Sequence, residues 1–330
     1  MTHAKPAPSG PCRAPSTPAT RRGAFTVIEL VVVLAMIVVL LAILLPTLAR
    51  AREHARYVRW QAYSKLMQSH PDMLAYFNLE QQNAGDNQVW NRASGSPTEM
   101  ARTSFEPRQF NAFFHRSAGT TQAEFIANDA PETQFLDRWG KGRWHGKNSL
   151  EFRDVAGKYL RMKHHPVLNM NRSVNSSFTL FASFRADNIN PHDSLVSKAI
   201  TTRSSYGFLL NNDGTPQNGR LDVWIGPPSP NPTNGINSTL KYKQDTWQVA
   251  VMRYDGNATN VFINGQKDPM NLVSPKLKFT NPDDVTIGAD PHGIVEWLFG
   301  SIDEVGIMQN ALSDDQIREM HRVGAIKERD

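Results

Sequence analysis

The chain has 330 residues, of which 40% are hydrophobic and 20% charged, and its formal net charge is +5. The excess positive charge lies on both sides of one apolar segment near the N-terminus, while residues 66–330 are slightly acidic. This distribution excludes a nucleic-acid-binding surface as the explanation of the charge, and the single cysteine, Cys12, excludes a disulfide framework within the chain.

The apolar segment covers residues 25–45 and contains one charged residue, Glu29. Its length is sufficient for a helix that crosses the hydrocarbon core of a membrane. Arg21 and Arg22 precede the segment and favour a cytoplasmic N-terminus, although the arginines that follow it, from residue 50 to residue 59, weaken that inference. We predict a single-pass transmembrane helix here.

Residues 21–46, RRGAFTVIELVVVLAMIVVLLAILLP, resemble the prepilin-type cleavage and methylation motif of type IV pilins and type II secretion pseudopilins. The resemblance implies cleavage by prepilin peptidase and N-methylation of the new terminus, which involves Gly23, Ala24 and Phe25. Cleavage after Ala24 makes Glu29 the fifth residue of the mature chain, whereas cleavage after Gly23 makes it the sixth. We favour the first bond because alanine is the nearest small substitute for glycine.

Glu29 is the candidate assembly residue, because an ionised carboxylate in lipid is costly and needs a partner. The resemblance implies that this partner is the terminal amine of a neighbouring pilin-like subunit. A carboxylate near the membrane interface with no assembly role is the other interpretation. Pro46 predicts either a kink or the end of the membrane helix. The helix is expected to extend to residue 69, with arginines that contact anionic headgroups or line a solvated stalk.

From residue 70 onward, short alternating runs split by Gly, Pro, Asn and Asp predict an all-β sandwich. In the run 220–226, Leu221 and Val223 share one face and Trp224 points the opposite way. Strands are expected at 74–79, 148–152, 159–162, 177–186, 194–198, 206–212, 220–226, 246–255, 260–265, 284–290 and 300–308.

Two further local signals are clear. The dipeptide Asn264-Gly265 predicts a tight hairpin turn, and Ser313 with Gln316 predicts a capping box that begins a helix over 312–323. We divide the chain into a prepilin leader (1–24), a transmembrane and extended helix (25–69), a sandwich (70–326) and a tail (327–330). Within the sandwich, we expect residues 97–135 to be an insertion.

The runs 74–80, 148–162, 177–188, 247–266, 285–290 and 299–317 together resemble a concanavalin A-like, laminin-G-like jelly roll over residues 72–325. The expected fold class is therefore mainly β: a long N-terminal transmembrane α-helix followed by a concanavalin A-like (LamG-like) β-sandwich. The resemblance implies a candidate structural Ca²⁺ site at Asp303, with Glu304 and Asp154 as weaker candidates. The other interpretation is that Asp303 accepts hydrogen bonds from backbone amides. No other cofactor is expected.

Candidate glycan contacts are Trp224, Trp297, Tyr206, Asn211 and Asp213, because sugar rings stack on aromatic faces and bond to polar side chains. Packing in the core or at the rim is the competing interpretation for each tryptophan. The Glu-x-Asp-x-(x)-Glu strand motif of the glucanase branch is absent from the sequence, so we predict that the protein is not an enzyme.

The sequence thus predicts a prepilin-like or pseudopilin-like protein of the bacterial inner membrane, with its sandwich in the periplasm or outside the cell. Expected partners are prepilin peptidase, the membrane, other pilin-like subunits and a glycan or envelope protein, with no nucleic acid. A membrane-tethered adhesin or carbohydrate-binding protein that does not assemble into a pilus is the alternative. A carbohydrate-active enzyme is the third and weakest candidate.

Overall fold

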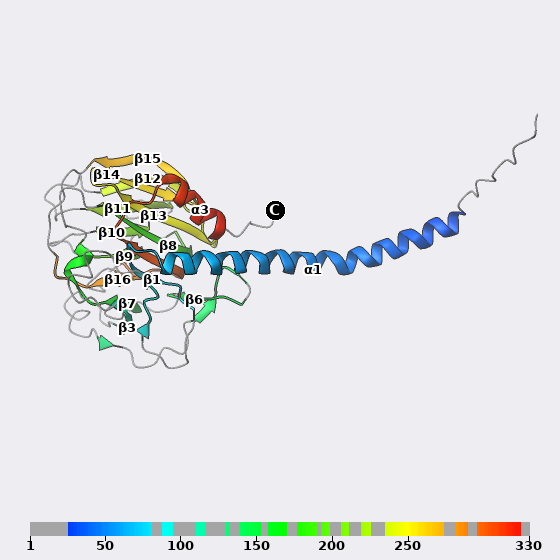
Figure 1. Cartoon of the computed structure of the whole chain (residues 1–330), viewed down its shortest axis with the longest axis horizontal. Coiled ribbons are helices and arrows are strands. Elements are labelled where there is room, and N and C mark those ends of the chain that lie inside the picture. Colours follow the sequence, from blue (N-terminus) through cyan, green and yellow to red (C-terminus); the bar gives the residue numbers. More distant parts are fainter. Residues whose placement is uncertain are drawn as a thin grey trace, which may run out of the picture. The chain divides into compact units, whose positions relative to one another are not determined.

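The computed structural model describes residues 26–80, 88–94, 110–116, 130–131, 139–144, 146–152, 158–169, 177–189, 193–198, 206–210, 219–225, 235–273, 281–289 and 296–324. The chain divides into two compact units, Met1–Ala51 and Arg52–Asp330. Figure 1 labels the helices and strands along the chain. The division falls inside the long helix α1 (Val27–Gln68), rather than at the predicted boundary between residues 69 and 70.

Helix α1 begins with a capping box. The amide and hydroxyl of Thr26 donate to a Glu29 carboxylate oxygen at 2.8 and 3.0 Å, and the Glu29 amide donates to the Thr26 hydroxyl at 3.2 Å. The helix continues through Pro46, and the Thr47 hydroxyl bonds the Leu44 carbonyl one turn back at 2.9 Å. Pro46 therefore lies inside the helix and does not end it.

The part of α1 before Pro46 is apolar on every side. Its large apolar side chains from Val27 to Leu45 are all exposed. Such a helix suits the interior of a bilayer or a helical assembly. It is long and apolar enough to cross a membrane, which makes it a candidate membrane anchor.

The later part of α1 belongs to the second unit and is amphipathic. Trp60, Ser64 and Met67 are buried, and their spacing of four and three residues places them on one helical face. This part of α1 packs on the sandwich, and for this reason the compact unit begins at Arg52 rather than at residue 70.

Two antiparallel sheets form the sandwich. In the described residues, sheet A has the order β15 (Gln266–Val273), β14 (Ala258–Ile263), β13 (Gln248–Tyr254), β8 (Phe178–Ala186), β17 (Gly300–Met308), β6 (Asn148–Glu151) and β5 (Trp139–Lys141), and β1 (Met73–Phe77) also pairs with β17. Sheet B has the order β12 (Gly235–Lys241), β11 (Arg220–Ile225), β10 (Tyr206–Leu210), β9 (Asp193–Ser197), β16 (Val285–Ile287), β7 (Lys158–Met162), β3 (Ala112–Arg116) and β2 (Gln88–Val89), with β4 (Ala130–Pro131) beside β3.

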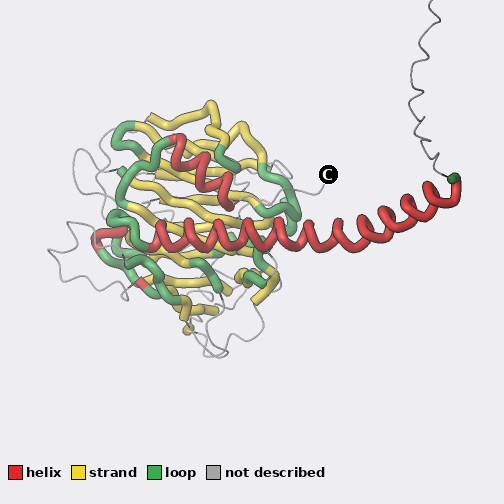
Figure 2. The backbone as a smooth tube through the Cα atoms, turned by 45° about the vertical axis from the view of Figure 1, so that its right-hand side comes forward, coloured by secondary structure: helices red, strands yellow, loops and turns green. Residues whose placement is uncertain are grey.

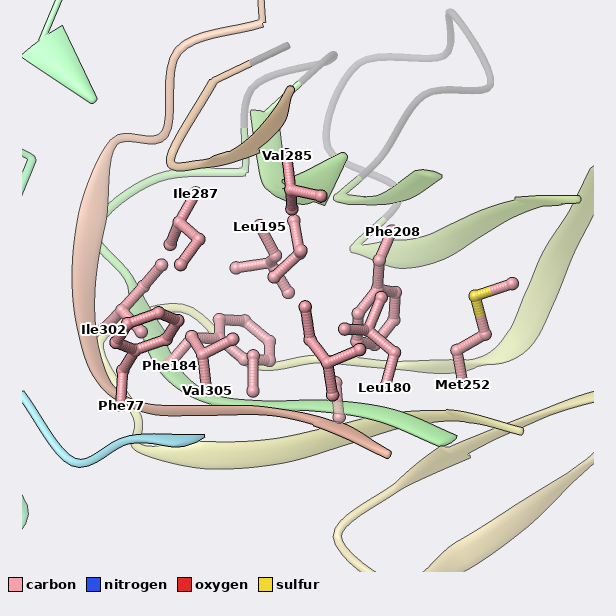
Figure 3. Packing of buried hydrophobic residues seen from close by; sticks show 14 of the residues in the cluster. Phe77, Leu180, Phe184, Leu195, Phe208, Met252, Val285, Ile287, Ile302 and Val305 are labelled. Carbon is pink, nitrogen blue, oxygen red and sulfur yellow. The ribbon is translucent and has the colours of Figure 1, made fainter. Parts of the chain in front are cut away.

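The main core lies between the two sheets and follows from the alternation of side chains along each strand. Leu180 and Phe184 of β8 point inward from sheet A, and Phe208 and Ile287 point inward from sheet B (Figure 3). These side chains are fully buried. The predicted strands of sheet A and sheet B are confirmed because their apolar alternation matches this core.

A second apolar layer covers the outer face of sheet A. Phe181 and Val251 point away from the main core and pack with Met67 of α1 and Ile317 of α3 (Asp314–Gly324). Figure 2 shows the later part of α1 and α3 lying over one layer of strands. Sheet A is therefore buried on both faces, which explains why β13, β14 and β17 are buried along their whole length.

The local predictions of turns and caps are confirmed. Asn264 and Gly265 adopt positive φ angles of 52° and 75° between β14 and β15, as a two-residue hairpin turn requires. The amide of Ser313 donates to Gln316 Oε1 at 2.8 Å, and the amide of Gln316 donates to Ser313 Oγ at 3.2 Å.

Other elements escaped the sequence patterns. β12 is rich in Asn, Ser and Thr, β15 contains Pro269, and β2, β4 and β5 have two or three residues each. Within the predicted insertion at 97–135, β3 pairs with β7 inside sheet B and buries Phe114 in the core.

Candidate functional site

A buried cluster of charged residues lies under α1, and Asp303 and Glu304 of β17 are its acidic members. The register between β17 and β8 shifts between Ile302 and Glu304, which marks a β-bulge at Asp303. Neighbouring residues in a regular strand point to opposite faces, but a bulge inserts an extra residue and removes this alternation. Both carboxylates accordingly reach the same guanidinium, that of Arg143.

Arg143 joins the two acids from the segment between β5 and β6. Its Nη2 donates to Glu304 at 2.6 Å, its Nε lies 3.1 Å from Asp303 Oδ2, and its backbone amide donates to the same Asp303 oxygen at 2.8 Å. Its Nη1 donates to the Gly324 carbonyl at 3.2 Å, and its guanidinium lies 4.5 Å from the ring centroid of Trp144. The guanidinium thus connects the last strand, the last helix and a loop.

Lys147 is the second cation of the cluster, and its side chain is completely buried. Its ammonium donates to Asp303 Oδ1, to the Asp303 carbonyl at 3.0 Å and to the Asn78 carbonyl at 2.9 Å. β17 pairs with β6 at residues 301–302 and with β1 at residues 305–308. The ammonium therefore occupies the gap in strand pairing between β6 and β1.

Helix α1 completes the cluster. Trp60 Nε1 donates to Glu304 Oε2 at 3.3 Å, and the Tyr76 hydroxyl donates to Glu304 Oε1. Trp60 is 1% exposed, and its ring lies 5.1 Å from Trp144 and 4.6 Å from the Lys147 ammonium. The cluster therefore fixes the later part of α1 to the sandwich.

The two acids and the two cations balance each other in charge, which buried ions require. Burial alone raises the pKa of Asp303, but Arg143 and Lys147 outweigh it, so that its pKa lies below the ordinary value. Burial lowers the pKa of Lys147, and Asp303 opposes that effect. The surroundings of Asp303 keep its carboxylate ionised.

This arrangement does not fit the calcium site expected at Asp303. Ca²⁺ takes about six to eight oxygen ligands, whereas cationic groups of Arg143 and Lys147 contact both oxygens of this carboxylate. In the part of the chain that the structure describes, no group of three His, Cys, Asp or Glu residues is arranged to hold a metal. Asp303 accepts hydrogen bonds from a backbone amide and from side chains, and Asp154 lies outside the described residues.

A different candidate site lies on the outer face of sheet B, around Trp224 of β11. The indole is 37% exposed, and its Nε1 donates to Asp222 Oδ2 at 2.6 Å. Gly235 of β12 is the direct cross-strand partner of Trp224. A Cβ atom at Gly235 would stand 3.8 Å from the indole, in ordinary contact. Asp222 thus holds the ring in one orientation, and a glycine leaves room beside it.

The other predicted glycan contacts do not gather around Trp224. Trp297 lies 6.1 Å from Tyr159 of β7, between ring centroids. Three strands separate β7 from β11, which is roughly 19 Å at the usual strand spacing. Tyr206 is 1% exposed and packs against Phe178 in the core, so its prediction as a ligand contact is wrong.

The remaining predicted residues divide into two groups. The carboxylate of Glu29 is bonded within its own helix by Thr26. The residues Gly23, Ala24, Phe25, Asn211 and Asp213 lie outside the described residues. Processing at the first three and ligand contact at the last two stay predictions.

Part of the sandwich matches a known protein family. Residues 157–318 match the model of the concanavalin A-like lectin/glucanases superfamily, Laminin_G_3. The match lies within the sandwich and covers just under half of the chain. This confirms the expected fold: a long apolar N-terminal helix followed by two antiparallel sheets of concanavalin A-like type. A search of curated protein sequences finds no match.

Solved structures with a similar chain path include binding domains and enzymes. Domain 4 of AbnA, an arabinanase from Geobacillus stearothermophilus in complex with arabinotriose, is 14% identical with a TM-score of 0.48, over 76% of this chain and 98% of that one. The binding domain of botulinum neurotoxin DC in complex with SialylT is 10% identical with a TM-score of 0.46, over 77% of this chain and 51% of that one. Trypanosoma rangeli sialidase is 10% identical with a TM-score of 0.48, over 81% and 37%. Such distant similarity assigns no ligand and no activity to the concanavalin A-like domain.

Several notable residues of the domain had no sequence signal. Asp193 of β9 is buried, and this burial raises its pKa to about 7 although the Phe299 amide donates to it at 3.2 Å. Burial also lowers the pKa of Lys198 to about 8, and its ammonium lies 3.0 Å from His164 Nδ1. The pair Asp303-Glu304, acidic within an apolar strand, was a usable signal for buried basic partners such as Arg143.

Proposed function

We propose that this protein is a prepilin-like, membrane-anchored protein that displays its concanavalin A-like domain outside the membrane as a binding module. The proposal is supported by the resemblance of residues 21–46 to a prepilin-type motif, together with a helix that is apolar on every side and exposed from Val27 to Leu45. The later part of the same helix packs on the sandwich through Trp60 and Met67. The anchor and the displayed domain therefore share one continuous helix.

The processing of the N-terminus tests this proposal. Membranes of the native host are solubilised, the protein is purified, and the mass of its N-terminal peptide is measured. A chain that starts at N-methylated Phe25, or at Ala24, supports the prepilin pathway. An intact Met1 terminus contradicts it and leaves a simple membrane tether.

The role of Glu29 separates assembly from anchoring. Its carboxylate accepts two hydrogen bonds from Thr26, and glutamine also serves in a capping box. Glu29→Gln therefore keeps the cap and removes the charge. If Glu29 binds the terminal amine of a neighbouring subunit, this variant stays in the membrane but loses crosslinks between subunits. If crosslinks persist at the wild-type level, the assembly role is refuted.

The second candidate function is that of a tethered carbohydrate-binding protein that does not assemble, and the fixed, exposed indole of Trp224 favours it. A retaining glycosidase needs two carboxylates about 5 Å apart across the substrate. The carboxylate beside the indole, Asp222, instead accepts the hydrogen bond of the indole. We therefore propose binding rather than hydrolysis at this face.

A glycan array with residues 52–330 tests this second candidate. Trp224→Ala is compared with Trp90→Ala, because Trp90 is also 37% exposed and lies beside β2 at the far edge of sheet B. Stacking on one aromatic ring contributes about 0.5–1.5 kcal/mol beyond area burial, so Trp224→Ala is expected to weaken a bound glycan roughly tenfold. Equal binding by the two variants contradicts the assignment.

A further inference from the structure

Three arginines, Arg50, Arg52 and Arg56, follow the apolar part of α1. Arg50 and Arg52 are exposed and Arg56 is half-buried. Among the described residues, no acid forms an ion pair with any of these three side chains. Arg143, Arg161 and Arg253 of the sandwich, in contrast, each pair with an acid.

Their position in the helix relates them to a membrane surface. From Val27 to Leu45 the helix is about 29 Å long, close to the thickness of a hydrocarbon core. Arg50 follows Leu45 by about 8 Å along the helix and Arg56 by about 17 Å. The Cα–Cβ bonds of a helix tilt toward its N-terminus, so these side chains lean back toward the apolar segment. The headgroup layer of about 5–7 Å and the salt-screened zone of about 10 Å beyond it together span about 15–17 Å, which reaches Arg56.

We propose that Arg50, Arg52 and Arg56 form a basic collar that binds the anionic phospholipid headgroups of the leaflet where the apolar helix ends. The proposal rests on the membrane anchoring proposed above. Charge complementarity selects the partner, because a guanidinium forms strong bonds with phosphate. Orientation of the helix does not explain these arginines, since basic residues on both flanks cancel as a topology signal.

Arg59 supplies an internal control. It lies about 21 Å beyond Leu45 along the helix, outside the zone that the headgroups influence. Its charge instead acts on Glu319 of α3 and helps to lower the pKa of that carboxyl, whose main partner is Arg322. The exposed Arg318 and Arg322 of α3 pair with acids on their own helix.

The experiment uses the full chain in vesicles. Protein is reconstituted in phosphatidylcholine with spin-labelled phosphatidylglycerol or spin-labelled phosphatidylcholine, and the relative association of the two labels is measured at low and high salt. The wild type is expected to prefer the anionic label severalfold at low salt and less at high salt. The variant Arg50→Gln/Arg52→Gln/Arg56→Gln is expected to show a markedly lower ratio than the wild type.

The control Arg59→Gln/Arg318→Gln/Arg322→Gln removes as many charges and is expected to keep the preference. A variant with the three collar arginines exchanged for lysine keeps the positive charge and is expected to keep the lipid preference. That result would show that the glutamine variant loses the preference through its lost charge and not through misfolding. An equal ratio for the wild type and the collar variant overturns the proposal. So does a collar variant that loses only crosslinks between copies of the chain, since that result assigns the arginines to a protein partner.

Carbonate extraction of neutral phosphatidylcholine vesicles separates failure of the anchor from failure of the collar. Release of the wild-type chain overturns both the anchor and the collar. Retention of the chain without any lipid preference overturns the collar alone.

Discussion

Loss of the Arg143 side chain is the sharpest test of the buried cluster. Arg143→Leu leaves Asp303 bonded to Lys147, but it leaves Glu304 buried without a cationic partner. Removing one partner of a buried ion pair costs about 3–5 kcal/mol, because the remaining charge is uncompensated. The lost contact with Trp144 at 4.5 Å adds about 0.5–2 kcal/mol. We expect the free energy of unfolding to fall by about 3.5–7 kcal/mol in total.

The measurement is urea unfolding of residues 52–330, followed by tryptophan fluorescence. The double variant Arg143→Leu/Glu304→Gln removes the uncompensated charge and keeps an acceptor for the Tyr76 hydroxyl. We expect it to lose at least about 1 kcal/mol less than the sum of the two single variants, because the pair is coupled. Arg318→Leu, at an exposed ion pair of α3, is the control and should cost less than about 1 kcal/mol.

Two results would refute this reasoning. A loss below about 1 kcal/mol for Arg143→Leu would mean that the cluster contributes no more than a surface ion pair. Strict additivity in the double variant would mean that Arg143 and Glu304 do not interact, despite their separation of 2.6 Å.

Three further predictions concern stability. A fragment of residues 70–330 lacks Trp60 and Met67. In a urea titration its free energy of unfolding should be about 5 kcal/mol lower than that of residues 52–330, or the fragment should aggregate. Burial raises the pKa of Asp193 to about 7, so the folded state holds a proton that the unfolded chain releases near pH 4. The free energy of unfolding therefore falls by about 1.4 kcal/mol per pH unit as the pH rises between these two values. Asp193→Asn should remove that slope in urea titrations at pH 5 and pH 7, whereas Asp245→Asn at an exposed turn should keep it. A Cβ atom at Gly306 would stand 2.1 Å from the Phe181 ring. Gly306→Ala should therefore destabilise the fold by about 1–3 kcal/mol and lower the thermal midpoint of unfolding. An unchanged midpoint would show that the ring moves aside freely.

Features that depend on neighbouring residues were predictable. The apolar run after Thr26 determined the helix, and the phase of residues 220–225 determined that Trp224 faces outward while Leu221 and Val223 enter the core. The turn at Asn264-Gly265 followed in the same way from its own side chains. These signals act over a few residues and need no distant partner.

Tertiary structure decided the partners of the buried groups. Asp303 meets Arg143 from 160 residues away, and the bulge that turns both acids toward it arises from the register with β8. Tyr206 enters the core because β10 pairs with β9 and β11 in one particular phase, which its short apolar run does not determine. The sequence by itself therefore determined the apolar helix, the β class and the exposed indole, because local periodicity sets them. Only the tertiary structure decided that α1 joins the sandwich from Arg52 and that cations surround Asp303, because strand register and helix docking bring those distant residues together.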